Sequence, residues 1–211
     1  LSISGGYGNL TSLEGLNNLS YIGGYLRIQG QDLISLSGLE SLTSIQEDMI
    51  IKGNDALLSF DGLDNLTSIG GNLKIGDPGI CGDNPLLSDI SALSALDHIG
   101  GNLSLSDNYA LTDLNGLEGL TTIPGELFIS GNASLSSLSG LENVTSIGER
   151  LHFCFNNIIT DFSGLDNLIS IGGSLSIKSN ASMISLSGLN NLTAVGKSLS
   201  IGGYNGSESQ L

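Results

Sequence analysis

The stretch Leu127–Ile147, with the sequence LFISGNASLSSLSGLENVTSI, is the unit from which most of this 211-residue chain is built. Its Gly140-Leu141 pair recurs at positions 116, 164 and 188, each 24 residues from the next, and earlier at positions 15, 38 and 62, with a degenerate copy at Ala92-Leu93. A fixed period of this length is typical of a solenoid, in which each unit buries its apolar face against the next unit. We therefore expect eight repeats of about 24 residues.

Two apolar spacings follow one another within each unit. Leu127 and Ile129 are two residues apart, and this alternation of apolar residues is typical of a strand with one buried face. After them, Leu135, Leu138 and Leu141 follow at a spacing of three, which fits neither a regular helix nor a long strand. This spacing indicates short extended pieces joined by bends. The fold class is thus mainly β, with little or no helix.

Paired glycines follow the last isoleucine of many units, at 23–24, 70–71, 100–101 and 172–173. Since glycine reaches positive φ at little steric cost, we expect these pairs to form corners. An asparagine also stands three residues after the last apolar strand residue, and we expect its side chain to satisfy backbone groups in a buried turn. These asparagines are Asn54, Asn108, Asn132, Asn156 and Asn180.

Units of the form L-x-I-x-x-N-x-x-L-x-x-L-x-G-L-x-x-L-x-x-I-G-G resemble leucine-rich repeats of the receptor L-domain type, and the segment 65–75, NLTSIGGNLKI, carries this pattern. The resemblance covers the whole chain. It implies a right-handed solenoid in one domain, 1–211, with an insertion at 77–82. Similar repeats occur in extracellular parts of insulin-receptor and EGF-receptor relatives and in secreted and cell-surface proteins of microbes. The cysteine-rich modules and disulfide-closed ends of the receptors are missing, so the resemblance implies no receptor ligand.

The composition limits the partners and the location of the chain. A net charge of -15 opposes binding to nucleic acid and to anionic membrane surfaces. No run approaches the roughly 20 apolar residues that a spanning helix needs, so we expect no membrane insertion by this segment. The chain opens in mid-repeat at Leu1 and shows no signal peptide, so we expect a fragment of a longer extracellular or cell-surface protein.

No catalytic or metal-binding constellation stands out, and we expect neither an enzyme nor a cofactor. His98 and His152 have no spaced partners of the kind that bind metals, and they occupy outward positions of the repeat. Cys81 and Cys154 lie three repeats apart, about 14 Å along the axis, so we expect two free thiols. In the insertion, Asp77, Asp83 and Asp89 offer oxygen ligands for calcium, but their spacing is not that of an EF-hand. We favour a plain surface loop.

One face of the strands differs from the rest of this acidic chain. Two positions of each repeat should face outward from the strands: the middle residue of the strand, and the residue directly after its last apolar residue, as at Gln29, Ser106 and Ser130. Four of the six basic residues occupy these positions, and no acidic residue occupies them. We expect a binding or adhesion module that presents this face to a protein or glycan partner. The alternative is that the strands are merely neutral between acidic, solubilising loops. The candidate binding residues are Arg27, Lys52, Lys74, Phe128, His152 and Lys178.

We expect Arg27 and Lys74 to lie near one end of this face and Phe128 and His152 towards the other. A ligand that uses both pairs is then extended, with a length of about 15–20 Å.

An ice-binding protein is the alternative function. The Leu-Thr-Ser-Ile segments stack a hydroxyl ladder that a flat face can use to order water. Asp97 and Ile169 interrupt it, and threonine is also an ordinary strand residue. The threonines are Thr43, Thr67, Thr121, Thr145 and Thr193.

The end repeats lack polar caps. Open strand edges pair readily with other chains. We therefore expect end-to-end self-association or a chain that continues past one or both ends.

Overall fold

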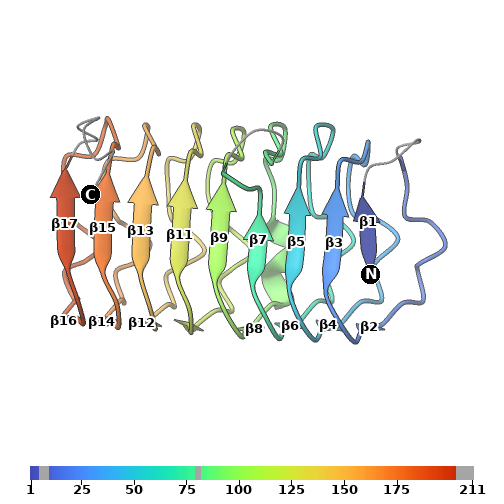
Figure 1. Cartoon of the computed structure of the whole chain (residues 1–211), viewed down its shortest axis with the longest axis horizontal. Coiled ribbons are helices and arrows are strands. Elements are labelled where there is room, and N and C mark those ends of the chain that lie inside the picture. Colours follow the sequence, from blue (N-terminus) through green and yellow to red (C-terminus); the bar gives the residue numbers. More distant parts are fainter. Residues whose placement is uncertain (5–9, 79–81, 203–211) are drawn as a thin grey trace, which may run out of the picture.

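The long strands of the repeats form one parallel sheet. The computed structural model describes residues 1–4, 10–78 and 82–202, and in it nine strands lie side by side in chain order (Figure 1). Leu127 lies in register beside Leu103 on one neighbour and Leu151 on the other. The strands are β1 (Ser2–Ser4), β3 (Leu26–Gln29), β5 (Met49–Lys52), β7 (Leu73–Ile75), β9 (Leu103–Ser106), β11 (Leu127–Ser130), β13 (Leu151–Cys154), β15 (Leu175–Lys178) and β17 (Leu199–Gly202).

Two rows of short strands run along the lower edge of this sheet (Figure 1). The first row contains β2 (Tyr21–Ile22), β4 (Ser44–Ile45), β6 (Ser68–Ile69) and β8 (His98–Ile99). The second contains β10 (Thr122–Ile123), β12 (Ser146–Ile147), β14 (Ser170–Ile171) and β16 (Ala194–Val195). Within the described ranges the only helix is the short 3-10 helix η1 (Ser91–Ala95), and no helix has the length and apolarity that crossing a bilayer requires. The predicted mainly β solenoid of about eight turns is therefore confirmed.

Apolar residues of successive repeats fill one continuous core. In β11, Leu127 and Ile129 are fully buried, whereas Phe128 between them is half-exposed. Leu135 and Leu138, at the spacing of three, are also fully buried. Burying one leucine or isoleucine side chain contributes about 1.5–3 kcal/mol relative to leaving it in water. Because each repeat contacts mainly its neighbours, this stabilisation is spread evenly along the rod.

The prediction that paired glycines provide positive φ at the corners is wrong. Positive φ occurs instead at the glycine of the Gly-Leu pairs, as at Gly140 with a φ of 107°, and at glycines that follow the long strands, such as Gly131 with a φ of 72°. The corner glycines are needed because neighbouring backbones touch. A Cβ atom on Gly100 would lie 2.0 Å from the carbonyl oxygen of Gly70, and one on Gly172 would lie 2.1 Å from that of Gly148.

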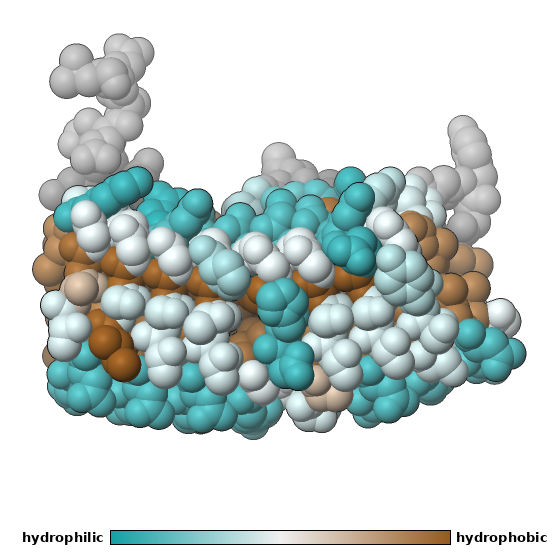
Figure 2. Space-filling model, turned by 90° about the horizontal axis from the view of Figure 1, so that it is seen from below, coloured by the Kyte–Doolittle hydropathy of each residue, from teal (hydrophilic) through white to brown (hydrophobic). Residues whose placement is uncertain are grey.

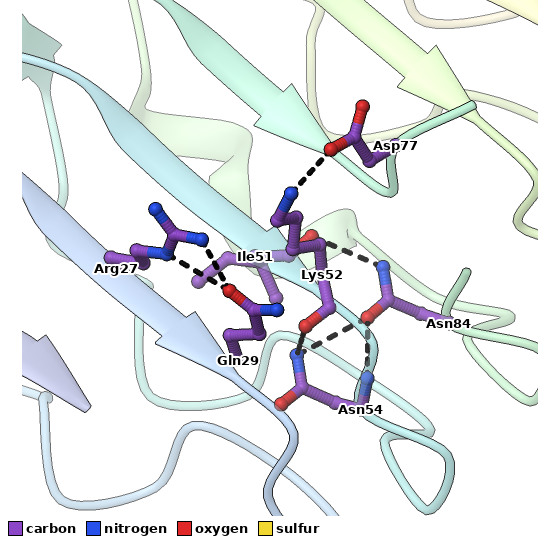
Figure 3. A network of polar contacts seen from close by, with 7 residues as sticks. All are labelled: Arg27, Gln29, Ile51, Lys52, Asn54, Asp77 and Asn84. Atoms are coloured by element: carbon purple, nitrogen blue, oxygen red, sulfur yellow. Dashed lines mark hydrogen bonds and ion pairs between the residues drawn. The ribbon is translucent and has the colours of Figure 1, made fainter. Parts of the chain in front are cut away.

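The predicted asparagine ladder is present and runs through the interior. Asn54 donates to the Oδ1 atom of Asn84 at 3.2 Å (Figure 3). Asn84 in turn donates to the Oδ1 atom of Asn108 at 3.0 Å. The hydrogen bonds between side-chain amides continue from Asn108 to Asn132 and from Asn132 to Asn156, at 3.3 Å each. Asn84 was not predicted, because the insertion displaces it from the usual spacing. The ladder satisfies buried backbone groups at every turn, which explains asparagine at these positions.

The sheet ends in two strands that each pair on one side only, β1 and β17. On β17, Leu199 is 61% exposed and Ile201 is 53% exposed. Apolar positions that are buried in the inner strands are therefore open on this edge strand.

Candidate binding face

Phe128 and His152 form a stacked pair on the outer face of the nine-stranded sheet, the side to which the middle residues of the strands project. The strands β11 and β13 place the two residues directly opposite each other. Their ring centroids lie 5.1 Å apart, and the ring planes differ by 5°. Parallel strands are spaced by about 4.8 Å, so the sheet itself sets the separation of the rings. Both side chains are half-buried and present the pair rigidly.

His152 connects this pair to a buried thiol. Its Nε2 atom lies 3.1 Å from the Sγ atom of Cys154, which donates to the hydroxyl of Ser130 at 3.2 Å. Burial, and next the positive charge of Arg150, lowers the pKa of His152, while burial raises the pKa of Cys154. Both pKa shifts favour a neutral imidazole beside a neutral thiol. The predicted free thiol is found at Cys154, whereas Cys81 lies outside the described residues.

Two serines that directly follow the last apolar residue of their strands are buried, although we expected side chains at this position to face outward. Ser106 is fully buried and Ser130 is 8% exposed. They lie beside one another on β9 and β11, with Cys154 next to them on β13. A serine side chain is short and is covered by longer neighbours. In the described part of the chain, the Ser106 hydroxyl and the Nδ1 atom of His152 are buried without a hydrogen-bond partner.

Two of the predicted basic residues are tied to their neighbours, as Figure 3 shows. The guanidinium of Arg27 donates to the side-chain oxygen of Gln29, at 3.0 Å from Nε. The ammonium of Lys52 forms an ion pair with Asp77. The expected absence of negative charge on this face is therefore wrong. β7 ends one residue earlier than the neighbouring long strands. Gly76, with a φ of 77°, then turns the chain so that Asp77 lies alongside the end of β5.

The other two lysines occupy different places on the sheet. Among the described residues, neither Lys74 nor Lys178 has an ion-pair or hydrogen-bond partner for its ammonium group. Lys178 borders an open hollow of about 510 Å³ at the β17 end, beside Met183 and Ile201. Lys74 lies on β7, two strands from Arg27 and also two strands from Phe128. We expected Arg27 and Lys74 to form one pair, distant from the pair of Phe128 and His152. This division is wrong, since Lys74 lies as near to Phe128 as to Arg27.

An open groove of about 240 Å³ lies between Lys74 and Phe128. One face of the Phe128 ring stacks on His152, so its other face looks along the sheet towards Ser104 and Lys74. The carboxylate of Glu126 is held by Arg150 at 2.7 Å. The lining residues are Lys74, Gly76, Asp77, Pro78, Asn102, Ser104, Glu126 and Phe128.

Sequence reasoning missed two polar residues of this groove, Asn102 and Glu126. The backbone N–H of Asn102 donates to Oδ1 of Asn72, and that of Glu126 donates to Oδ1 of Asn102, each at 2.7 Å. These residues form a second ladder directly before the strands. The available signal was the recurrence of a polar residue just before the strand leucine at all three positions.

The threonines of the alternative ice-binding face lie along the short strands. Figure 2 views this side and shows pale rows along the rod, interrupted near the middle by hydrophilic residues. Most of the hydroxyls donate to carbonyl oxygens of the preceding repeat: Thr43 to Ser20 at 2.9 Å, and Thr67, Thr145 and Thr193 to Thr43, Thr121 and Ile169 at 3.1 Å. Their hydroxyl protons are thus engaged within the protein.

The acidic residues near the insertion are dispersed. Asp77 pairs with Lys52, and Asp89 accepts from the backbone N–H of Ser91 at 2.8 Å. Across the residues that the structure describes, no three histidine, cysteine or acidic side chains gather in a way that suits a metal ion. The part of the insertion at 79–81 lies outside those residues.

No protein-family profile, curated protein or solved structure matches this chain.

Proposed function

We propose that this protein is a non-enzymatic binding or adhesion module, extracellular or at the cell surface, that presents the outer face of its nine-stranded sheet to a protein or glycan partner. The observation that carries the proposal is the stacked, half-exposed pair of Phe128 and His152. Aromatic side chains that stay accessible on a rigid scaffold are common anchors of binding surfaces.

The rigidity of the pair supports this role. Each ring stands on a central strand that is hydrogen-bonded on both sides, and fully buried leucines lie before it and aromatic or aliphatic residues after it. A partner that docks here orders few additional side chains, so less conformational entropy opposes binding. The adjacent groove adds polar groups that can fix the orientation of a ligand.

Chemistry at Cys154 is disfavoured by its surroundings. Nucleophilic catalysis by cysteine requires a thiolate, and the raised pKa of Cys154 together with the lowered pKa of His152 opposes a charged thiolate–imidazolium pair. Cys154 is also buried, at 5% exposure of the residue. These features support a binding role over an enzymatic one.

The repeat type belongs to the same proposal. We assign the solenoid to leucine-rich repeats of the receptor L-domain kind. The roughly 24-residue repeat, the parallel Leu-x-Ile strands and the interior asparagine ladder support this assignment. Proteins with such repeats act outside the cell, which agrees with the proposed location.

A partner screen with a matched pair of variants tests the binding proposal. The purified chain is applied to protein and glycan arrays, and hits are measured again with Phe128→Ala and Ser200→Ala. Phe128→Ala should weaken binding at least about tenfold, while Ser200→Ala, at an exposed position of the same column, should not. Melting temperatures should stay close to that of the unchanged protein because both side chains face outward. Equal binding by both variants would exclude this face.

Ice binding is the second candidate, favoured by the mostly exposed threonines that recur beside the short strands. The engagement of their hydroxyl protons with backbone carbonyls weakens it. Thermal hysteresis and ice-recrystallisation assays decide between the two functions, since a sheet-face binding module should show neither activity.

A further inference from the structure

The groove beside Phe128 has the form of a slot for one ring. Across the sheet, Lys74, Ser104 and Phe128 occupy the same register position on three successive strands. Lys74 and Phe128 are thus two strand spacings apart, about 9.6 Å. Only the short side chain of Ser104 stands between them. A ring lying over Ser104 would contact the open face of Phe128 on one side and the stem of Lys74 on the other.

The size of the slot limits its occupant. Pockets that enclose drug-sized ligands measure about 300–1,000 Å³. The groove of about 240 Å³ is smaller and open to solvent, so it suits a single ring of a longer molecule that continues along the face.

The lining has one apolar platform surrounded by hydrogen-bonding groups. The platform is Phe128, and the polar groups include the Lys74 ammonium, the Ser104 hydroxyl, the Asn102 amide and the Glu126 carboxylate. A pyranose ring is complementary to this arrangement, because it has an apolar C–H face and a rim of hydroxyls. An aromatic side chain of a protein partner would cover the same polar groups without giving them hydrogen bonds, which costs free energy for each group.

Charge distinguishes between kinds of sugar. The groove contains the cation of Lys74, but Glu126 and Asp77 also line it, and the whole chain carries -15. Both carboxylates are paired with a cation, Asp77 with Lys52 and Glu126 with Arg150, so the repulsion of an anionic sugar comes from the net charge of the chain. A neutral sugar avoids this repulsion and can both donate to Glu126 and accept from Lys74.

We infer that the slot between Lys74 and Phe128 binds a neutral pyranose ring of a glycan, stacked on the free face of Phe128 over Ser104. The inference rests on the proposed binding function of the outer face and adds the ligand class and the position of the ring.

The test uses saturation-transfer NMR and titrations with the whole chain. The probes are the neutral tetrasaccharides cellotetraose, mannotetraose and galactotetraose, with tetragalacturonate as the anionic counterpart. Ser104→Phe is the central variant, because the added ring lies on Phe128 and fills the slot while Phe128 and His152 remain. Ser200→Phe adds the same ring at an exposed position of β17 and is the matched control.

We expect at least one neutral tetrasaccharide to bind and tetragalacturonate to bind more weakly. Ser104→Phe should weaken that binding at least about tenfold, and Ser200→Phe should leave it unchanged. Circular dichroism and the melting temperature confirm that both variants are folded.

Three results overturn the inference, and they differ from the failure of the proposed function. Binding of a neutral saccharide that Ser104→Phe leaves intact excludes the slot, and Phe128→Ala then decides whether the face is still used. Binding of tetragalacturonate alone excludes a neutral ligand. If no saccharide binds but a protein partner depends on Phe128, the face is an interaction surface and the glycan assignment fails.

Discussion

Removing one amide from the interior ladder, by Asn132→Ala, should be among the most destabilising single substitutions in the chain. Asn132 is fully buried, and its side chain takes part in five hydrogen bonds. Its Oδ1 atom accepts from the backbone N–H of Asn108 at 3.1 Å, and its Nδ2 atom donates to the carbonyl of Leu105 at 3.0 Å. Truncation leaves the N–H of Asn108 buried without an acceptor, which costs about 1–3 kcal/mol, and removes the other hydrogen bonds of the side chain, each of which contributes about 0.5–1.5 kcal/mol net. The expected loss is about 3–5 kcal/mol.

Asn143→Ala is the matched control. Asn143 is exposed, and its side chain makes a single bond, from Nδ2 to the carbonyl of Glu118 at 2.8 Å. Water replaces that bond, so the expected cost is below about 1 kcal/mol.

Urea denaturation and amide hydrogen exchange measure the effect together. Exchange at the Asn108 amide is the sharper readout, because this N–H loses its acceptor directly, and a local loss of 3 kcal/mol raises its exchange more than about 100-fold. If Asn132→Ala costs no more than Asn143→Ala, or if the Asn108 amide stays protected, the ladder does not provide the stabilisation argued here.

Three further predictions concern a turn, a histidine and the sheet edge. Gly140→Ala should cost at least about 1–3 kcal/mol in urea denaturation, because the position has a φ of 107° and the new Cβ atom would lie 1.9 Å from a carbonyl oxygen; a stabilised variant would contradict this. The lowered pKa of His152 means that its contribution to stability is complete above about pH 6.5 and is lost as the pH falls towards the folded-state value. His152→Gln should therefore flatten the fall of melting temperature between pH 7.5 and 5, whereas His98→Gln, at an exposed position, should not. Ile201→Lys should reduce end-to-end self-association in sedimentation equilibrium, since it places a charge on an exposed edge strand; unchanged association would exclude this edge.

The fold was predictable because its determinants are local and repeated. Period-two spacing in segments such as Leu127–Ile129 identifies the strands, and the 24-residue distance between most Gly-Leu pairs places them in register. The role of the corner glycines was not predictable in the same way. Whether a glycine is needed for positive φ or for close approach depends on where the next repeat's backbone runs, as the contact between Gly100 and Gly70 shows.

The candidate site was only partly predictable from the sequence. Alternation placed Phe128 and His152 on the outer face, but their stacking depends on side-chain rotamers that no spacing rule determines. The pairing of Lys52 with Asp77 arises from the irregular turn after β7, where the period breaks. Asn102 and Glu126 lie outside the strands, and their position at the groove follows from how the chain enters each strand.

The interior asparagine ladder gives the rod a direction. The backbone N–H of each ladder asparagine donates to the Oδ1 atom of the next one, while its Nδ2 atom also donates to a carbonyl of the preceding repeat. The ladder is therefore directional, and its two ends are not equivalent. A second rod continues this ladder only when it meets the first head to tail, with its own asparagines in the same direction. Such contacts are head-to-tail and do not close on themselves, so association through the ends produces open filaments rather than symmetric dimers.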